Sequence, residues 1–305
     1  MAADNLRPRA RATLFRGGAI GCALIDGHRV FDAHVHMQPW HMLKPAVHAV
    51  MTRGRTDLEE LTSFQRDPPA FERYLSEAGI DGAVCVNYVS PTVMGFPPET
   101  NDWIADYCRQ ATRLVPMGSV HPRAVADPRA EAERIVRLGI RAFKVHPAHQ
   151  LLYPHDEGYR PLYEIAARER IPVTIHTGTS IFPGAKNRFT DPIHVDDVAV
   201  DNPDVRFLVA HAGRPLWPET AFFLARRHAN VYLELSGIPP KKLLEYLPRL
   251  PEVADKCVWG SDWPSPGIRS LRQNVLDFLA LPGLSDAQKE RILWTNAASL
   301  FRRDN

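Results

Sequence analysis

The sequence lacks the features that mark several large classes of protein. Its 37 Lys and Arg residues are balanced by 35 Asp and Glu residues, so the net charge of +2 gives no field that would recruit nucleic acid or an acidic membrane. No uninterrupted apolar run approaches the ~20 residues that a membrane-spanning helix needs. No glycine-rich dinucleotide fingerprint follows the first strand-like run. We therefore expect a partner that is a small molecule, and neither nucleic acid nor a membrane.

Cysteine is also scarce. The four cysteines show no CxxC spacing, and two of them, Cys85 and Cys257, fall inside apolar runs where cysteine is usually a small buried hydrophobe. The stretch up to Gly27 has basic residues but only a glycine-interrupted apolar part, which makes a poor secretion signal. Both observations favour a reduced, cytoplasmic setting.

The chain does have 27 prolines and a regular alternation of short apolar runs with longer amphipathic ones. Each short run is rich in β-branched or aliphatic residues and ends in Gly, Pro or a polar residue, as strands do. Eight such runs are present, at residues 29–36, 79–88, 113–122, 139–147, 171–178, 205–213, 231–237 and 256–264.

Helical patterns separate these runs, most clearly over residues 127–139, where Asp127 can cap the helix and Gly139 can end it. Residues 159–170 and 271–281 have similar apolar spacing, and residues 285–301 resemble a closing helix. Strands joined by helical crossovers pair in parallel. Eight units predict an α/β fold of the (β/α)8 TIM barrel type, with an open doubly wound sheet as the alternative.

The predicted domain organisation is an N-terminal extension over residues 1–28 and one barrel over residues 29–305, with an insertion at about 37–70. That insertion and the segment 179–192 are both longer than ordinary barrel loops. Both follow the carboxyl end of a strand, the face on which barrels of this type carry their active sites.

Polar residues end four of the predicted strands. His34 and His36 end the first, His176 the fifth, His211 the sixth and Asp262 the eighth. These strand ends converge on one mouth of a barrel, and residues two apart in a strand face the same side. Three or four imidazoles and a carboxylate with open positions suit Zn²⁺, and Mn²⁺ or Fe²⁺ less exclusively.

The motifs FDAHVH, TIHTG, LVAHAG and WGSDWP, in this order and on these strands, resemble the amidohydrolase superfamily. The resemblance runs roughly from Arg29 to Phe301 and is strongest to the branch that contains ACMS-type decarboxylases and related metal-dependent hydrolases and lactonases. It implies that His34, His36, His176 and Asp262 bind a catalytic divalent metal, and that His211 polarises the attacking water.

The chemistry of these groups agrees with that implication. A bound divalent metal lowers the pKa of its water toward ~7 and polarises a carbonyl oxygen. Asp262 can accept the proton of that water and pass it to the leaving group, which makes Asp262 and His211 the predicted catalytic residues. In a decarboxylase, His211 would help to protonate the ring carbon.

The fourth strand leaves two interpretations open. Lys144 and His146 in FKVHP face the same side, and the segment resembles the fourth strand of dihydroorotase and urease, where a carboxylated lysine bridges two metals. In that case Lys144 and His211 would bind a second ion. We favour the other interpretation, in which Lys144 forms an ion pair inside the barrel with Glu234, because a buried charge needs a partner. His146 would then contact substrate.

The segment after the fifth strand carries Lys186 and Arg188 beside Phe182 and Phe189. Cations next to aromatic rings suit a carboxylate on an apolar body, so Lys186 and Arg188 are predicted substrate-binding residues. Other residues that follow strands could add donors, although an ordinary exposed loop residue is the favoured interpretation of each: His121 and Arg123 after the third strand, Asn87 and Tyr88 after the second, and Arg214 after the sixth. The oligomeric state is open, with a homodimer as one option.

The function favoured by the sequence is metal-dependent hydrolysis of a C–O or C–N bond in a small, carboxylated lactone, ester or amide. The first alternative is non-oxidative decarboxylation of an aromatic or unsaturated acid at the same metal site, and the second is a metal-independent lactonase. A catalytically silent binding barrel is the alternative from another class, and the complete set of ligand residues argues against it.

Overall fold

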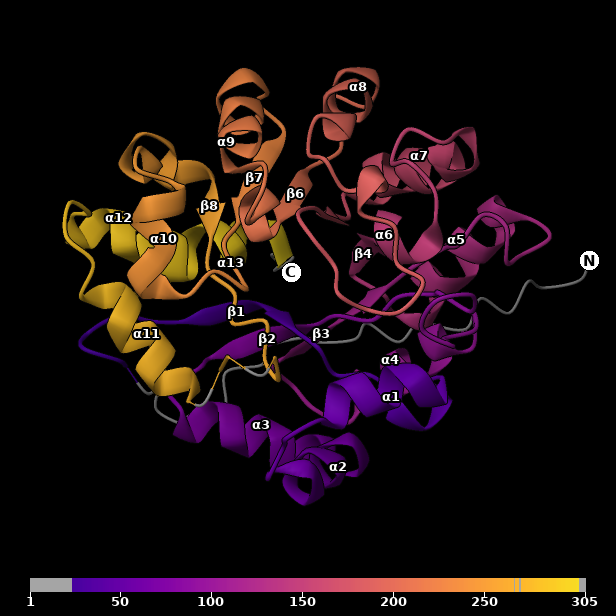
Figure 1. Cartoon of the computed structure of the whole chain (residues 1–305), viewed down its shortest axis with the longest axis horizontal. Helices are drawn as coiled ribbons and strands as arrows, with labels where there is room; N and C mark the ends of the chain where they lie inside the picture. The colour runs from indigo at the N-terminus through magenta and orange to yellow at the C-terminus, as the bar shows by residue number, and fades with distance from the viewer. Residues whose placement is uncertain (1–23, 266, 269, 302–305) are drawn as a thin grey trace, which may run out of the picture.

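Eight short parallel strands form the centre of the molecule, and neighbours in sequence are neighbours in the sheet (Figure 1). The computed structural model describes residues 24–265, 267–268 and 270–301. The strands are β1 Phe31–Val35, β2 Gly82–Cys85, β3 Leu114–Gly118, β4 Ala142–Val145, β5 Val173–His176, β6 Phe207–Ala210, β7 Val231–Glu234 and β8 Cys257–Val258. All eight predicted strands are confirmed, and every strand pair is parallel.

Backbone hydrogen bonds also join the last strand to the first, so the sheet closes into a barrel. Ala33 N donates to Trp259 O at 3.1 Å, His36 N donates to Trp263 O at 2.7 Å, and Asp262 N donates to His34 O at 2.9 Å. The (β/α)8 barrel is therefore confirmed, and the open doubly wound sheet is excluded because such a sheet has two free edges.

Helices surround the barrel (Figure 1). The α-helices are α1 Pro45–Thr52, α2 Leu58–Arg66, α3 Pro68–Glu77, α4 Thr100–Arg109, α5 Pro128–Leu138, α6 Pro147–Gln150, α7 Arg160–Glu169, α8 His194–Asp201, α9 Pro218–Arg227, α10 Leu243–Tyr246, α11 Leu271–Leu279, α12 Asp286–Glu290 and α13 Asn296–Phe301. Short 3-10 segments are η1 Trp40–Met42, η2 Glu157–Tyr159, η3 Asn187–Phe189, η4 His211–Gly213, η5 Pro240–Lys242 and η6 Leu250–Lys256, and η7 Arg291–Thr295 is a π-helix.

The helices predicted from the sequence are confirmed, and α5 shows why. The Asp127 carboxylate accepts hydrogen bonds from Arg129 N and Ala130 N at the start of the helix. Gly139 ends it with a φ of 108°, a conformation that favours glycine. The closing segment is built from α12, η7 and α13 rather than from one continuous helix.

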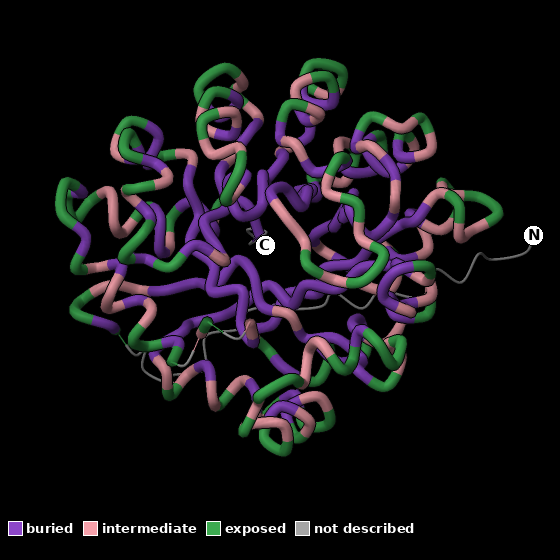
Figure 2. Tube along the Cα trace, in the orientation of Figure 1, coloured by how far each residue is buried: buried purple, intermediate pink, exposed green. Residues whose placement is uncertain are grey.

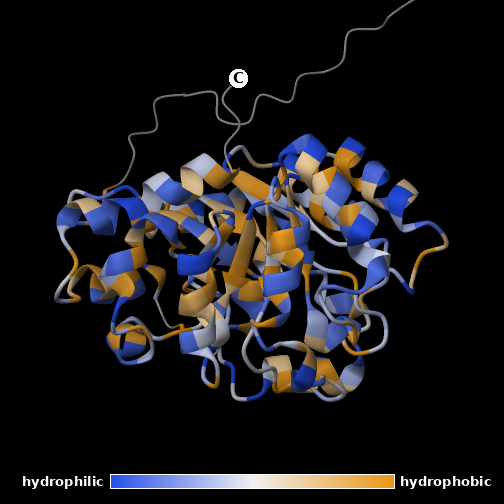
Figure 3. Ribbon diagram, turned by 90° about the horizontal axis from the view of Figure 1, so that it is seen from above, coloured by the Kyte–Doolittle hydropathy of each residue, from blue (hydrophilic) through white to orange (hydrophobic). Residues whose placement is uncertain are grey.

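Buried residues run through the strands, while the outer faces of the helices are exposed (Figure 2). Seen from above, the strands are mostly hydrophobic and the helices carry mixed surfaces (Figure 3). Cys85 and Cys257 are buried free cysteines, as the apolar runs around them predict, and Cys22 lies outside the described residues. Among the helices described, none has the length and apolar character to cross a membrane.

The long segment after β1 is helical and packs against the end of β8. It contains η1, α1, α2 and the start of α3. Trp263, next to Asp262, stacks on Phe71 with ring centroids 5.2 Å apart and also contacts Phe64 and Tyr74. The segment thereby supports one wall of the barrel mouth. The proposed division at residue 28 stays a prediction, since residues 1–23 lie outside the described part of the chain.

Candidate active site and metal centre

Three side chains in or just beyond the two strands that close the barrel, β1 and β8, point at one another. His34 Nε2 lies 3.3 Å from His36 Nε2, His36 Nε2 lies 3.1 Å from Asp262 Oδ1, and His34 Nε2 lies 3.7 Å from the same oxygen. Ligand atoms at about 2.0–2.2 Å from a tetrahedral ion are themselves roughly 3.3–3.6 Å apart. The spacing of these three atoms therefore fits one divalent ion.

The fourth predicted ligand, His176, lies beside this group but outside it. The candidate ligand atoms of His34, His36 and Asp262 all lie within 4.8 Å of one another. No ring nitrogen of His176 lies within 4.8 Å of all three. Its ring centroid is 4.8 Å from that of His211, and its Nε2 is buried with no hydrogen-bond partner among the described residues. A buried, unpaired imidazole nitrogen is a costly arrangement that a ligand would satisfy. His176 as a ligand stays a prediction.

Burial favours the neutral form of three of the histidines, and neighbouring groups favour the ionised form of the aspartate. Burial lowers the pKa of His34 and of His176 well below the ordinary value, and lowers the pKa of His211 to about 3. Burial opposes the ionisation of Asp262, but the nearby His211 and His36 hold its pKa well below the usual range. Neutral imidazoles and a carboxylate are the protonation states that bind a metal ion.

A stack of three imidazoles forms the opposite wall. The ring of His146 lies between those of His149, at 3.6 Å, and His176, at 3.9 Å, with the planes within 13°. The hydroxyl of Tyr88 lies 2.9 Å from His149 Nδ1, and Ser180 Oγ lies 2.7 Å from His149 Nε2. The predicted substrate contact His146 is thus buried beside the histidine cluster, and its Nδ1 has no partner among the described residues.

His149 and Ser180 were not singled out from the sequence. His149 lies on the short helix α6, three residues beyond His146, so strand periodicity gives no sign of it. Ser180 and Phe182 come from the long segment after β5, and Phe182 packs edge-on against His149 with ring centroids 5.5 Å apart. The predicted residues Lys186 and Arg188 of the same segment are exposed, and Arg188 lies over the ring of Phe189. Their role in binding substrate stays a prediction.

The direct ion pair expected between Lys144 and Glu234 is not formed. Lys144 Nζ is fully buried and has no hydrogen-bond partner within the described chain, and both oxygens of Glu234 accept hydrogen bonds from other groups. Burial lowers the pKa of Lys144 to about 8, although the charges of Glu234 and Asp262 act in the opposite direction. The second ion at Lys144 and His211 stays a prediction.

Arg214 approaches the site from the loop after η4. Its Nη2 lies 3.7 Å from Asp262 Oδ2, and its Nε is buried without a hydrogen-bond partner among the described residues. A Cβ on Gly237 would lie 2.3 Å from Nη2, so the glycine makes room for the guanidinium. Arg214 therefore brings an incompletely bonded cation to the candidate metal centre.

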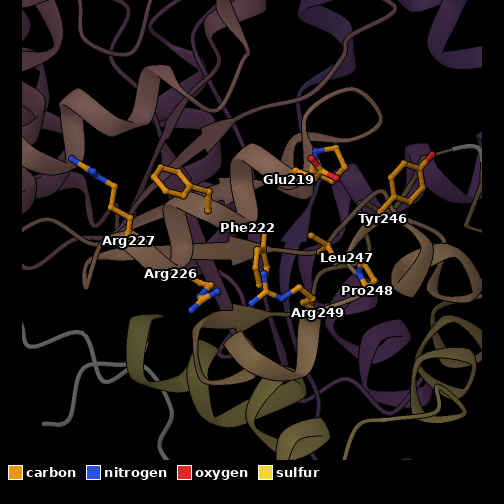
Figure 4. A pocket seen from close by; sticks show the side chains of 10 residues that line it. Glu219, Phe222, Arg226, Arg227, Tyr246, Leu247, Pro248 and Arg249 are labelled. Carbon is orange, nitrogen blue, oxygen red and sulfur yellow. The ribbon is translucent and has the colours of Figure 1, made fainter.

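A separate cavity of about 560 Å³ lies on the outside of the barrel, between α9 and residues 246–249 (Figure 4). Phe222, Tyr246, Arg226 and Arg249 are among its lining residues, and both arginines pair with Glu252. None of the strand-end histidines lines this cavity, so it is distinct from the candidate active site.

Solved structures of related barrels cover nearly the whole chain. An uncharacterised TIM-barrel protein of Bordetella bronchiseptica aligns with a TM-score of 0.69 and 23% identity, over 89% of this chain and 98% of that one. A 5-carboxyvanillate decarboxylase of Novosphingobium aromaticivorans with bound manganese aligns with a TM-score of 0.65 and 16% identity, over 91% of this chain and 98% of that one. A 2,6-dihydroxybenzoate decarboxylase complexed with 2,6-dihydroxybenzoate aligns with a TM-score of 0.63 and 16% identity, over 90% of this chain and 98% of that one.

At these identities the alignments support the fold alone. The comparison with curated protein sequences gives no match. The family model described as amidohydrolase, however, matches residues 31–303, from the first residue of β1 to beyond α13. The chain therefore belongs to the amidohydrolase family.

Proposed function

We propose that this protein catalyses the metal-dependent, non-oxidative decarboxylation of a small aromatic or unsaturated carboxylic acid. The observation that carries the proposal is the position of Arg214, a partly buried guanidinium with a buried, unsatisfied Nε beside the candidate metal ligand Asp262. A guanidinium fork binds a carboxylate through two parallel hydrogen bonds. A substrate carboxylate would supply the partner that Arg214 lacks.

The wall of the site suits a flat substrate. His146 and Tyr88 present their rings 4.7 Å apart, and Phe182 closes the far side of His149. The faces of His146 are covered by His149 and His176, so the wall offers ring edges, which also pack favourably on aromatic or conjugated ligands. This arrangement supports an aromatic or unsaturated acid over a saturated one.

The chain offers a metal site and a proton carrier. His34, His36 and Asp262 would hold a divalent ion, with His176 as the further candidate ligand. Such an ion supplies a Lewis acid that binds and polarises a substrate oxygen. Asp262, ionised at neutral pH, takes a proton from a substrate hydroxyl or from water and delivers it to the carbon that loses the carboxylate, as the C–C bond breaks and CO2 leaves.

The comparisons support decarboxylation ahead of the hydrolysis that the sequence favoured first. Two of the three solved structures described above are named as decarboxylases, of 5-carboxyvanillate and of 2,6-dihydroxybenzoate, and the first contains manganese. We therefore propose Mn²⁺ beside Zn²⁺ as the ion. Hydrolysis is the second candidate, because an ionised Asp262 and a neutral His211 are also the groups that would activate a water molecule.

The test uses protein stripped with a chelator and reloaded with Mn²⁺ or Zn²⁺. Hydroxylated benzoates and unsaturated diacids are offered beside lactones, esters and amides, while CO2 release and acid release are followed in parallel. In D2O, decarboxylation must place one deuterium on the product carbon. We expect CO2 release that depends on metal and falls at least tenfold in Arg214→Met.

Arg226→Lys, on the exposed outer cavity, is the matched control and should retain full activity. Acid release from a lactone or amide without CO2 would replace the proposal by the hydrolase. Turnover that is unchanged after complete removal of metal would contradict both.

A further inference from the structure

Glu234, at the end of β7, receives three hydrogen bonds in the interior of the barrel. His34 Nδ1 lies 2.7 Å from Oε2, Ser236 Oγ lies 2.8 Å from the same oxygen, and Ser236 N donates to Oε1 at 2.7 Å. Both Glu234 and Ser236 are completely buried. The carboxylate therefore has a defined partner for each oxygen.

The chain of contacts continues to the sixth strand. His211 Nδ1 lies 3.0 Å from Ser236 Oγ and 3.0 Å from Ser236 O. One path thus links His34, Glu234, Ser236 and His211. It connects a candidate metal ligand to the candidate water-polarising residue.

The direction of each proton follows from what the groups can donate. An ionised carboxylate only accepts, so His34 must carry its proton on Nδ1, and Ser236 must give its hydroxyl proton to Glu234. Ser236 Oγ and Ser236 O can then only accept from His211, which must also carry its proton on Nδ1. Both imidazoles are left with a bare Nε2. In His34 this nitrogen is the one beside His36 and Asp262.

The backbone is shaped to admit this carboxylate. A Cβ on Gly260, in the turn after β8, would lie 2.6 Å from Glu234 Oε1 and 2.8 Å from His34 Cβ. Any side chain at this position would displace one of the two hydrogen-bonded partners. Glycine is therefore required here by close approach rather than by its backbone angles.

We propose that Glu234 and Ser236 are a pair of positioning residues that fix the Nδ1–H tautomer of both His34 and His211. Within this pair, the Glu234 carboxylate sets the nitrogen that His34 offers to the metal. Ser236, through its hydroxyl and its backbone carbonyl, sets the nitrogen that His211 offers to the substrate or water. The inference rests on the proposed function only for the reaction itself. Its claims about tautomers and metal affinity are independent of the substrate.

The same side chains could instead hold an ion of their own. His34, His211 and Glu234 each offer a ligand atom within 4.8 Å of the others. The 2.7 Å contact between His34 and Glu234 is a hydrogen-bond distance, and it occupies the atoms that such an ion would need. The test below separates the two arrangements.

Glu234→Gln and Ser236→Ala separate the two halves of the pair. A carboxamide has the shape of the carboxylate, but one of its two ends donates. It therefore cannot accept from His34, Ser236 Oγ and Ser236 N together. In Glu234→Gln, the proton of His34 should no longer be fixed on Nδ1, and metal binding should weaken. Ser236→Ala should leave Glu234 and His34 in place and affect His211.

The primary measurement is long-range ¹H–¹⁵N correlation on histidine-labelled full-length protein, with and without Zn²⁺, with signals assigned from His34 and His211 variants. In the wild type both residues should be Nδ1–H even without metal. Glu234→Gln should lose this state at His34. Its dissociation constant for Zn²⁺, measured against a chromophoric chelator, should rise about 10–100-fold, as is typical when the residue behind a metal-binding histidine is lost.

Ser236→Ala should change the Zn²⁺ dissociation constant less than threefold, alter the His211 signal and lower kcat more than it raises KM. Glu252→Gln, in an exposed ion pair with Arg249, is the matched control. Wild-type tautomers and metal affinity in Glu234→Gln would overturn the proposal, as would a second Zn²⁺ that is lost in this variant. If Glu234→Gln does not fold, an unchanged His211 signal in Ser236→Ala would overturn it. The absence of decarboxylation would refute the proposed function alone.

Discussion

At the scale of single residues, two of the candidate catalytic side chains have an uncommon backbone. His211 and Asp262 have φ values of 63° and 65°, and Ala212 after His211 has 44°. Residues with a Cβ avoid this region at a cost of about 1–2 kcal/mol each. Hydrogen bonds hold the arrangement, since Asp262 N donates to His34 O and Arg214 N donates to His211 O. The turns that present these side chains are thus fixed before any ligand arrives.

Replacing Asp262 by asparagine tests its role as proton carrier. Asparagine tolerates a positive φ and retains an acceptor oxygen, but it has no charge and cannot take the proton. We expect kcat to fall by at least ~10²-fold, the usual size of a general acid–base contribution. Bound metal, measured by elemental analysis, should fall less than in His34→Ala.

Asp255→Asn, an exposed substitution close to β8 in sequence, serves as the control. Near-normal turnover of the true substrate by Asp262→Asn would remove Asp262 from the mechanism.

At the scale of elements, the sequence specifies strands and helices well and side-chain partners poorly. The start of every strand lies within about three residues of its predicted position, because apolar runs and their Gly or Pro ends are local signals. The alternation within a strand also places Lys144 and His146 inside the barrel. It does not say which neighbour each one meets. Glu234 bonds to His34 rather than to Lys144 because barrel closure, a long-range event, sets that contact.

Helix α5 gives a prediction at this scale. Asp127 caps its first turn by accepting two backbone hydrogen bonds, so Asp127→Ala should lower the free energy of unfolding by about 1 kcal/mol. Asp127→Ser, which retains a capping oxygen, should recover most of the loss. Urea unfolding of the two variants and the wild type measures both effects. Equal free energies of unfolding for the alanine variant and the wild type would show that the cap contributes nothing to stability. As a control, enzymatic turnover should not change in either variant.

At the scale of the whole molecule, the barrel mouth concentrates buried imidazoles. Burial lowers the pKa of His149 and of His211 to about 3, and that of His34, His146 and His176 well below the ordinary value. Burial acts oppositely on the carboxyls, raising the pKa of Asp32 to about 7 and that of Glu234 above its usual value. In the folded state, more of these groups have a lowered pKa, which disfavours protonation, than a raised pKa, which favours it.

This balance predicts a protein that loses stability in mild acid. A histidine of pKa ~6.5 in the unfolded chain and about 3 in the fold contributes its full stability above pH ~6.5 and loses it as the pH falls toward 3. Each such histidine should lower the free energy of unfolding by about 2 kcal/mol as the pH falls from 6.5 to 5. Asp32 and Glu234, whose folded pKa values are raised, offset part of the loss.

Urea unfolding of metal-free protein at pH 7, 6 and 5 measures the slope, and His149→Gln should reduce it. A free energy of unfolding that stays constant from pH 7 to 5 would contradict this account.

The closure of the barrel by its first and last strands also sets the order of events during synthesis. Ser261 N donates to Asp32 Oδ1 across 229 positions of sequence, and His34 and Asp262 are separated almost as far. At a translation rate of about 5–20 residues per second, roughly 10–45 s pass between the emergence of the two side chains. A nascent chain or a fragment that ends before β8 has the histidine pair of β1 without its carboxylate. On the proposed metal centre, tight retention of the ion therefore begins only once β8 and Asp262 have been synthesised and the ring of strands has closed.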